Sequence, residues 1–379
     1  MKKFFKKLLK IIFFSKKEFY FPPKNNIVIL DQIGAEKIKI SLLKELDFTV
    51  LDLREEKINI PILILSLFNF FRYGKYSYRI TFIQYTKAKI AITFIDTSLH
   101  FCFFMKKIKN CKLILIQNGR RQGLEIKPYL KKISQFKLEC DYYFVFNKNY
   151  AELMQNYLQT NFVIGGSILN NLFLPNKKFL KVKKIQYISE FHPKEACPND
   201  INYFNWEIQP TKFILEIIQE FCLEKKLELE IIGRIGDEKK EVEFYKNLNI
   251  KFKYVKKNFE NYSKISEDSI ITGMSSTFLG ECFSRFFRVA FFDIRNDFFL
   301  YNENRPGFAY PKSTDDHGYF WSNKPVKKKI LENLNFLYDV EENKWRSLVE
   351  EWSKEVVVHD FDNLIYKKIL KKEGIIKLN

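Results

Sequence analysis

The chain has 379 residues, of which 46% are hydrophobic and 29% charged, and its formal net charge is +19. This composition excludes a largely disordered chain, and the length favours two domains over one. The six cysteines are scattered without a CxxC pair, which excludes a disulfide framework and indicates reduced cytosolic thiols. The positive charge favours anionic partners such as nucleotides, nucleic acid or anionic lipid.

The first 22 residues are basic and amphipathic. On a helix, Phe4 and Leu8 would share one broad face, with Lys3 and Lys7 on the other. Lysines interrupt the apolar run and no small-residue cleavage site follows, so export is not expected. No segment is long and apolar enough to span a bilayer. The pattern predicts a cytoplasmic protein whose residues 1–22 lie on the anionic inner membrane face, with a helix packed on the protein or a solvated tail as the alternative.

Residues 23–166 alternate between short apolar runs and helix-like segments and begin with a βαβ pattern. Strands are predicted at Ile27–Leu30, Phe48–Leu53, Ile90–Phe94, Leu113–Ile116, Tyr142–Phe146 and Asn161–Ile164, and helices at Glu36–Leu46 and Ile62–Tyr73. The alternation favours a parallel sheet in a Rossmann-like domain. Gly165, Gly166 and the turn formers after them mark the end of this domain.

Residues 176–327 repeat the rhythm and predict a second Rossmann-like domain. Strands are predicted at Ile185–Ile188, Leu227–Ile232, Ile250–Tyr254, Ser269–Thr272 and Val289–Asp293, and a helix at Thr211–Glu224. Residues 328–379 add amphipathic helices around Trp345 and Ile365, which we expect to pack back on the domains already formed. The expected fold class is α/β, with two doubly wound domains facing a cleft and with ligands beyond the carboxyl ends of the strands.

A glycine and three consecutive hydroxyl residues follow the fourth strand of the second domain. Gly273 would let a ligand approach, and Ser275, Ser276 and Thr277 would donate to phosphate oxygens at the start of a helix that also carries Glu281. Free backbone N–H groups and the helix dipole favour an anion at this point. The alternative is that one serine only caps the helix.

A histidine follows the first strand of the second domain, in the string His192-Pro193. The proline fixes the turn, and the imidazole of His192 could then donate to a leaving phosphate. A surface histidine without a ligand is the alternative.

Polar residues also follow two strands of the first domain. Asp96 comes after Ile90–Phe94, and a carboxylate there can act as a general base or hold a sugar hydroxyl. Asn118, Arg120 and Arg121 come after the next strand, and the arginines can pair with a carboxylate or phosphate of an acceptor. A plain turn at Asn118 is the alternative.

Three further groups carry less weight. Asp31 and Arg54–Glu56 follow the first two strands, where an acid can be structural. Glycines and aromatic residues gather in Arg305–Phe308 and His317–Trp321, as in a loop that stacks on a base or sugar, or in a loop that is simply packed.

Four short strings occur in order along the chain: Thr93–Asp96, Ile116–Arg121, Gly318–Asn323 and Asp360–Asn363. In these strings the chain resembles bacterial surface-carbohydrate biosynthesis proteins of lipopolysaccharide and capsule, over nearly its whole length. The resemblance implies a GT-B-type glycosyltransferase with a terminal helix that returns to the first domain. It implies no metal and no cofactor, with a nucleotide-activated sugar as the donor substrate.

His192-Pro193 and Ser275-Ser276-Thr277 are similar to the HP and Ser/Thr motifs of bacterial sialyltransferase-like enzymes. There these motifs contact the phosphate of a CMP-activated donor. The resemblance thus implies a CMP-linked ulosonic acid as the donor and a glycan or lipid-linked acceptor. The acidic motif that supplies the base in those enzymes has no clean copy here, so Asp96 is the preferred candidate, followed by Glu125.

Two other functions stay open. An enzyme that transfers a polyol phosphate from a CDP donor to a teichoic-acid-like polymer would use a similar fold and phosphate site. A noncatalytic membrane-associated assembly protein would keep the fold without the chemistry. Nucleic-acid binding is not expected, because the chain has no zinc finger, RNP-like string or concentrated basic stripe.

Overall fold

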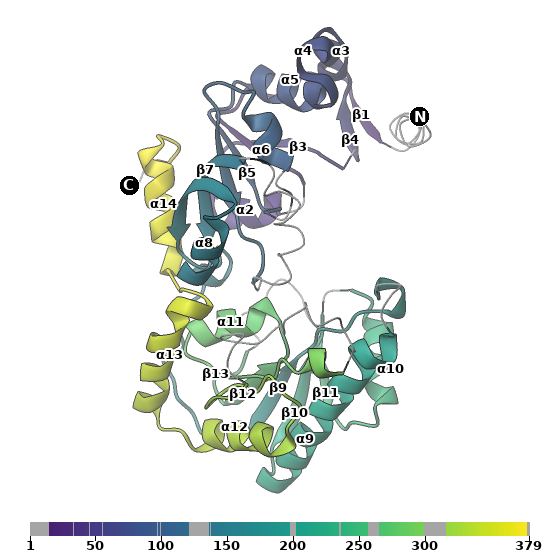
Figure 1. The fold of residues 1–379 in the computed structure, drawn as a ribbon, viewed down its shortest axis with the longest axis vertical. Helices are drawn as coiled ribbons and strands as arrows, with labels where there is room; N and C mark the ends of the chain where they lie inside the picture. The colour runs from purple at the N-terminus through teal and green to yellow at the C-terminus, as the bar shows by residue number, and fades with distance from the viewer. Residues whose placement is uncertain are drawn as a thin grey trace. The chain divides into compact units, whose positions relative to one another are not determined.

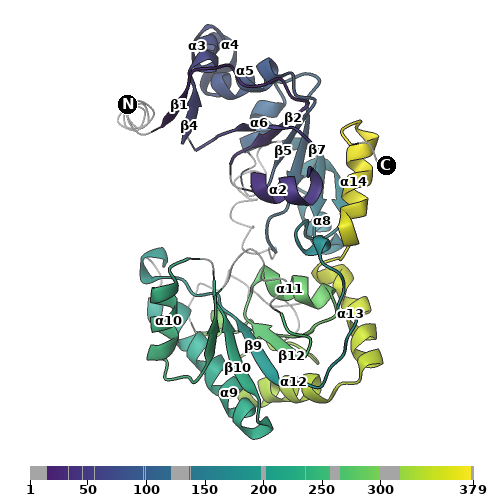
Figure 2. The same ribbon diagram turned by 180° about the vertical axis from the view of Figure 1, so that it is seen from behind.

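The computed structural model describes residues 15–376 except 33, 45, 55, 97, 99, 121–135, 137, 198–201, 235, 257–264 and 299–315. The chain forms two compact units, both labelled by element in Figure 1 and seen from behind in Figure 2. Unit 1 comprises Met1–Gly119, Leu130–Leu172 and Asp360–Asn379, and unit 2 comprises Arg120–Tyr129 and Phe173–His359. The chain therefore crosses between the units more than once.

Unit 1 contains a six-stranded parallel sheet in the order β3-β2-β5-β6-β7-β8. Its strands are β2 (Ile27–Leu30), β3 (Thr49–Leu51), β5 (Ile90–Thr93), β6 (Lys112–Ile116), β7 (Leu138–Val145) and β8 (Leu158–Ile164). All four residues of β2 and of β5 are buried, as expected of central strands that are covered on both faces. Each of the six apolar runs predicted as strands in this half forms a strand.

Helices and a small second ladder complete unit 1. The helices are α2 (Ala35–Leu42), α3 (Ile60–Phe68), α4 (Phe70–Tyr73), α5 (Ser77–Thr86), α6 (His100–Met105), α8 (Lys148–Met154) and α14 (Leu364–Lys372). The strand β1 (Lys16–Glu18) pairs in parallel with β4 (Lys57–Asn59). The predicted helix Ile62–Tyr73 is divided at Asn69 into α3 and α4.

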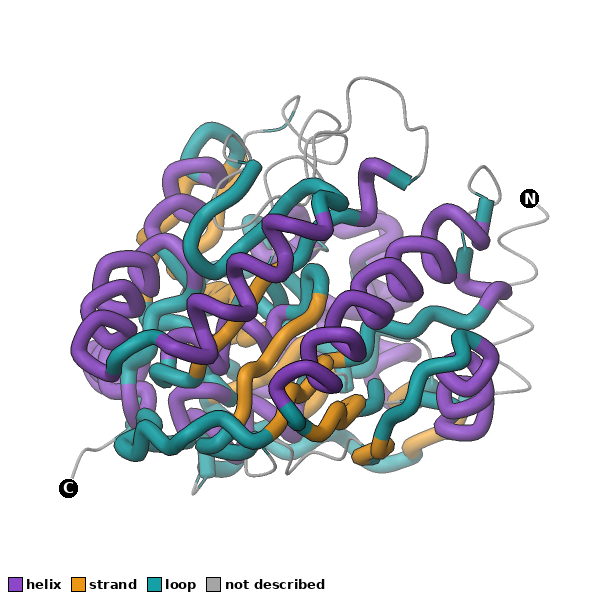
Figure 3. Tube along the Cα trace, turned by 90° about the horizontal axis from the view of Figure 1, so that it is seen from below, coloured by secondary structure: helices purple, strands orange, loops and turns teal. Residues whose placement is uncertain are grey.

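Unit 2 contains a five-stranded parallel sheet in the order β11-β10-β9-β12-β13. Its strands are β9 (Lys184–Ile188), β10 (Glu228–Ile232), β11 (Lys253–Val255), β12 (Ser269–Gly273) and β13 (Arg288–Phe291). The alternation of strands and helices along the chain is visible in Figure 3. Two parallel α/β sheets of this kind confirm the predicted fold class.

In the described part of unit 2 the α-helices are α9 (Gln209–Lys225), α10 (Glu238–Asn247), α11 (Thr277–Ser284), α12 (Lys327–Asp339) and α13 (Glu342–Val356). Helices α9 and α12 pack against each other and against the sheet, and α11 packs on the sheet with α13 beside it. The indole of Trp345 in α13 is fully buried and donates to the carbonyl of Phe286 at 3.1 Å. Helices α12 and α13 are thus part of the unit 2 core.

The division of the chain differs from the expected boundaries in three places, the first of which is that Arg120–Tyr129 belongs to unit 2. The first unit ends at Leu172 rather than at residue 166, and only Asp360–Asn379 returns to it. Tyr366 of α14 explains this return, because its ring stacks on Phe144 at 4.3 Å and its hydroxyl donates to the carbonyls of Val145 and Gly166. The helices expected together in 328–379 are therefore shared between the units.

The N-terminal segment is described only from residue 15. The predicted amphipathic helix falls on residues 1–14, which lie outside the described residues. The rest of the segment is extended, because Lys16–Glu18 forms β1 rather than a continuation of a helix. Within the described residues, no helix combines the length and the apolarity that crossing a membrane requires.

Candidate functional site

The carboxyl ends of β9, β12 and β13 meet at one edge of the unit 2 sheet, since these strands are parallel neighbours. Glu190 and His192 follow β9, Ser275 follows β12, and Asp293 and Arg295 follow β13. Ligands of parallel α/β sheets bind at this edge. The structure therefore brings the two predicted phosphate motifs to one place.

Glu190 occupies the anion position at the start of α11. Its carboxylate accepts hydrogen bonds from the backbone N–H of Ser275 and, at 2.8 Å, from the Ser275 hydroxyl. A helix start favours a negative charge because its N–H groups are unpaired and the helix dipole is positive there. At the turn where the sequence predicts an anion site, a carboxylate of the protein itself therefore accepts from both donors of Ser275.

The two neighbouring hydroxyl residues have separate internal partners. Ser276 is the N-cap of α11, and its side chain accepts from the N–H of Phe278 at 3.3 Å. The capping alternative therefore applies to Ser276. The hydroxyl of Thr277 accepts from the backbone N–H of Arg120 at 2.9 Å, so it anchors the loop that enters unit 2.

Gly273 and Glu281 have roles in packing. A Cβ on Gly273 would lie 3.1 Å from the carbonyl oxygen of Ile188, so the glycine permits close packing of β12 against β9. This differs from the expectation that Gly273 makes room for a ligand. Glu281 is buried in α11, and its carbonyl accepts from the hydroxyl of Ser284 at 3.0 Å.

Arg295 joins the two acids of the site. Its buried guanidinium lies 3.5 Å from the Glu190 carboxylate and 3.4 Å from that of Glu207 in η4 (Phe204–Ile208). Burial lowers the pKa of Arg295, but Glu207 and Glu190 outweigh this effect, so that the pKa is raised and the group stays charged. Its positive charge compensates the buried carboxylates, which would otherwise be costly to desolvate.

His192 is fixed through one ring nitrogen. Its Nδ1 lies 3.4 Å from the Glu207 carboxylate, and its ring packs against Trp206 with centroids 4.8 Å apart. The hydroxyl of Tyr203 donates to the His192 carbonyl at 2.7 Å. Because Nδ1 faces Glu207, the opposite nitrogen, Nε2, is the one that can reach a ligand. His192 thus belongs to the same connected cluster as Ser275.

Arg120 lies beside the start of α11. Its Nη2 is 3.4 Å from the Ser275 carbonyl and 3.7 Å from the Asp293 carboxylate, and its side chain is buried. The sequence had placed Arg120 in an acceptor site of the first domain. The structure instead adds it to the positive side chains around the unit 2 anion site.

Asp96 holds the loop after β6 in unit 1. It is 3% exposed, and its two carboxylate oxygens accept from the Tyr143 hydroxyl at 2.7 Å and the Asn118 N–H at 3.4 Å. Burial, followed by the charge of Asp96, raises the pKa of Tyr143 well above its usual value, so Tyr143 remains a donor. These contacts position the turn at Gln117–Gly119 and do not present Asp96 to solvent as a free base.

Several predicted residues fall elsewhere. Arg121, Glu125 and Arg305–Phe308 lie outside the described residues. The string His317–Trp321 is packed, because Phe320 is buried between rings and a Cβ on Gly318 would lie 2.1 Å from Trp321. The packed-loop alternative therefore holds for this string. No group of three His, Cys, Asp or Glu side chains in the described part of the chain could hold a metal ion.

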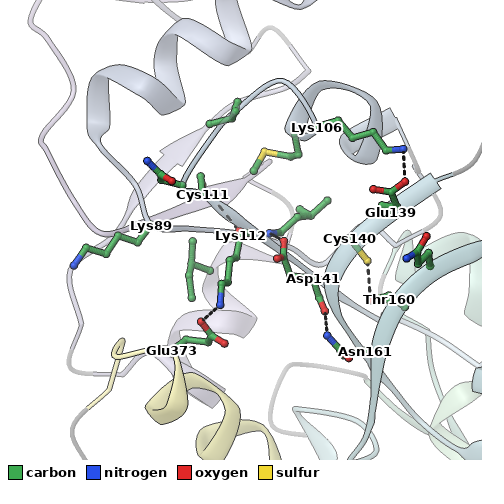
Figure 4. A pocket seen from close by; sticks show the side chains of 16 residues that line it. Lys89, Lys106, Cys111, Lys112, Glu139, Cys140, Asp141, Thr160, Asn161 and Glu373 are labelled. Carbon is green, nitrogen blue, oxygen red and sulfur yellow. Dashed lines mark hydrogen bonds and ion pairs between the residues drawn. The ribbon is translucent and has the colours of Figure 1, made fainter.

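A cavity of about 1020 Å³ lies in unit 1, among the first residues of β6, β7 and β8 (Figure 4). Two ion pairs lie in its lining, Lys112 with Glu373 and Lys106 with Glu139. Burial, with a smaller effect of the Asp141 charge, raises the pKa of the Cys111 thiol to about 12, so the thiol stays protonated and is a poor nucleophile. The cavity lies at the amino ends of the strands, away from the edge where ligands of such sheets bind.

Sequence reasoning missed Arg295, Glu207 and Asp293. Asp293 ends the predicted strand Val289–Asp293 and Arg295 follows it, so the strand-end rule that singled out His192 could have found both. Glu207 sits in a π-helical turn far from any strand end, and only the folded structure brings it to His192.

Residues 114–374 match the model of a family described as "putative O-antigen biosynthesis protein". Comparison with curated proteins gives no sequence match. Among solved structures, a glycosyltransferase from Rickettsia africae is similar at 12% identity with a TM-score of 0.52, covering 96% of this chain and 100% of that one. UDP-GlcNAc 2-epimerase from Methanocaldococcus jannaschii is similar at 13% identity with a TM-score of 0.51, covering 91% and 99%.

A third structure, TarM from S. aureus in complex with UDP, aligns at 15% identity with a TM-score of 0.43, covering 75% of this chain and 55% of that one. The likeness to the glycosyltransferase and the epimerase shows a shared GT-B-type fold.

Proposed function

The chain belongs to the O-antigen biosynthesis protein family, and we propose that it is a glycosyltransferase that moves a sugar from a nucleotide donor to a surface-polysaccharide acceptor. The family supports a role in the biosynthesis of a surface polysaccharide. The fold, shared with a glycosyltransferase and with an epimerase of a nucleotide sugar, supports the donor class. The observation that carries the proposal is the anion site at the start of α11, where Ser275 already binds a carboxylate.

In this proposal a donor phosphate takes the Ser275 donors from Glu190. The displaced carboxylate keeps a partner, because Arg295 lies 3.5 Å from it. Arg120, next to Ser275, adds positive charge near the leaving nucleotide. Donors that are fixed before the substrate arrives stabilise the developing negative charge without reorganisation.

His192 is the proposed acid of the site. With Nδ1 directed at Glu207, a protonated imidazole can donate through Nε2 to the phosphate oxygen that leaves with the nucleotide. Asp96, the preferred base from sequence, is assigned a positioning role for Gln117–Gly119 because both of its carboxylate oxygens accept hydrogen bonds. Glu281 is buried in α11, and we assign it a role in the packing of that helix.

The finer features of the donor and acceptor rest on motif similarity. The strings at His192 and Ser275–Thr277 favour a CMP-linked ulosonic acid, and a glycan or lipid-linked acceptor. A membrane-anchored acceptor would suit a cytoplasmic enzyme that lies at the anionic inner face of the membrane. A CDP-polyol phosphotransferase is the second candidate, since its donor would use the same phosphate site.

The test is a transfer assay with radiolabelled donors and a membrane fraction from O-antigen-bearing bacteria. The donors are a CMP-linked ulosonic acid, UDP- and GDP-sugars, and a CDP-polyol. Label from a nucleotide sugar in the lipid or polysaccharide fraction, lost with Ser275→Ala and kept with Ser284→Ala, supports the proposal. Label from the CDP-polyol alone would establish the second candidate, and no transfer from any donor would favour the noncatalytic assembly protein.

A further inference from the structure

Helix α3 buries two of its side chains, Ile62 and Ser66, and exposes an apolar stripe. Ser66 is its only polar side chain; it is 4% exposed, its hydroxyl donates to the Leu63 carbonyl, and its carbonyl accepts from Ser77 of α5. Leu67 is 64% exposed and Phe68 is 81% exposed. A surface helix in water usually turns most of its apolar side chains to the core and exposes polar ones.

The exposed face continues beyond α3. Ile64, Leu67, Phe68 and Phe71 follow the i, i+3, i+4, i+7 spacing of one helical stripe, although the helix is interrupted at Asn69. Phe71 is 99% exposed, and Phe70 beside it is also exposed. A contiguous apolar face of this kind on a folded protein marks an interaction surface.

Aromatic residues after β1 lie at the start of α3. Asn59, which caps α3, donates through its side chain to the Tyr20 carbonyl at 2.7 Å, and this bond ties residues 19–21 to the start of α3. Phe19 and Tyr20 are strongly exposed, whereas Phe21 stacks on Tyr85 of α5 at 4.6 Å. Figures 1 and 2 show β1, β4, α3, α4 and α5 together at one end of unit 1.

The segment that forms this surface carries positive charges, although the exposed Glu18 of β1 lies beside Asn59 at the start of α3. From Lys57 to Ile95 the sequence contains no aspartate or glutamate. Arg72 and Lys75 follow the stripe directly and are exposed. Cations that flank an apolar face match the lipid phosphates that lie above the acyl chains of a bilayer.

We propose that this surface, formed by Ile64, Leu67, Phe68, Phe71 and the flanking Arg72 and Lys75, binds an anionic phospholipid bilayer, with the phenylalanine rings in the interfacial region. A second copy of the chain fits less well, because a two-fold contact would place the same cations against each other. The inference rests on the proposed function only in expecting an acceptor at the membrane. It differs from the expected membrane contact of residues 1–14, because it uses a folded part of unit 1.

The first test is sedimentation of the full chain with vesicles of phosphatidylcholine alone or with a third of phosphatidylglycerol. We expect binding to the anionic vesicles only. Phe68→Ser with Phe71→Ser should weaken binding at least about tenfold, since each ring contributes apolar burial worth about 1–3 kcal/mol. Arg72→Gln with Lys75→Gln should weaken it about fivefold per charge, at about 1 kcal/mol each. Leu223→Ser, at an exposed leucine of α9 in unit 2, is the matched control and should have no effect.

A second measurement separates this surface from residues 1–14. Phe71→Trp in the full chain should show a blue-shifted emission and quenching by brominated lipid, relative to the wild-type spectrum, once vesicles are added. If the chain binds vesicles while Trp at position 71 stays in water, or if the phenylalanine substitutions leave binding unchanged, the proposal is wrong. A wild type that binds no vesicles but elutes as a dimer on gel filtration, together with a phenylalanine-to-serine variant that elutes as a monomer, would instead identify a second copy of the chain as the partner.

These outcomes are independent of the donor site, because no nucleotide is present. A protein that binds vesicles but transfers no sugar would overturn the proposed function and leave this inference standing. Thermal unfolding checks that each variant is folded. If the serine variant does not fold, the variant with both charges removed tests the proposal in its place.

Discussion

The carboxylate of Glu190 accepts hydrogen bonds from both the backbone N–H and the hydroxyl of Ser275. The two residues come from the ends of neighbouring strands, β9 and β12, and they meet at the start of α11. The donors of an anion site are thus already oriented, and the protein supplies its own anion. The guanidinium of Arg295 lies 3.5 Å from the same carboxylate.

Glu190→Gln should raise the affinity for a nucleotide. The carboxylate competes with a phosphate for the Ser275 donors, whereas an amide competes less and adds no like charge. Relief of this competition by about 1 kcal/mol corresponds to about a fivefold lower Kd in equilibrium dialysis. A higher Kd would show that Glu190 itself contacts the nucleotide, for example through a ribose hydroxyl.

His192→Ala should lower donor turnover about 100-fold, the lower end of the effect of general acid catalysis. The KM for the donor should change much less, because the proton is transferred mainly in the transition state. Lys194→Ala, on the same loop and exposed, is the control and should keep its activity. Equal losses in the two variants would indicate that the loop as a whole has been disturbed.

Asn363→Ala should lower the free energy of unfolding by about 2–4 kcal/mol. Asn363 is fully buried, donates to the Ile168 carbonyl at 2.9 Å and accepts from the Asn171 side chain at 2.9 Å. Its backbone has a φ of 57°, which alanine adopts with strain. Asn249→Ala, at an exposed residue with a φ of 59°, isolates the backbone effect, and urea unfolding should show a smaller loss there.

Acid should destabilise the protein partly through Glu230. Burial raises the pKa of this carboxyl, but hydrogen bonds from Gln186, Lys253 and Lys184 outweigh that effect and lower the pKa below 4.5. A lowered pKa in the folded state gives stability that is present above 4.5 and is lost as the pH falls through the folded value.

Thermal unfolding at pH 7 and pH 3.5 checks this. Glu230→Gln should narrow the difference in Tm between the two pH values. Glu228→Gln, exposed on the same strand, should leave the difference as in the wild type. If the difference in Tm between pH 7 and pH 3.5 is the same in Glu230→Gln as in the wild type, this carboxylate is not a source of the pH dependence of stability.

Much of the fold could be predicted from local patterns. The run Ile90–Phe94 forms β5 at Ile90–Thr93, because four consecutive apolar or β-branched residues suit a central parallel strand. The position of α13 could not be predicted, since an amphipathic pattern shows which face is buried but not what covers it. Only the structure places Trp345 against Phe283 and Phe320.

The site was predictable in part for the same reason. That Ser275 and His192 lie at one edge of the sheet was predictable, because both follow strands whose carboxyl ends meet. That Ser275 binds Glu190 could not be foreseen, since the contact joins side chains 85 residues apart. The two alternatives for His317–Trp321, a stacking loop or a packed loop, could not be separated because buried aromatic rings and ligand-stacking rings look alike in sequence.

The central claim, that the start of α11 binds the phosphate of a nucleotide donor, is tested most directly by calorimetric titration of CMP, CDP, UDP and GDP into the full chain. The account predicts that at least one of them binds the wild type and that Ser275→Ala weakens it about tenfold or more. Ser284→Ala, on the last turn of the same helix, should bind as the wild type does. Equal affinity in wild type and Ser275→Ala, or no binding of any nucleotide at millimolar concentration, would contradict it.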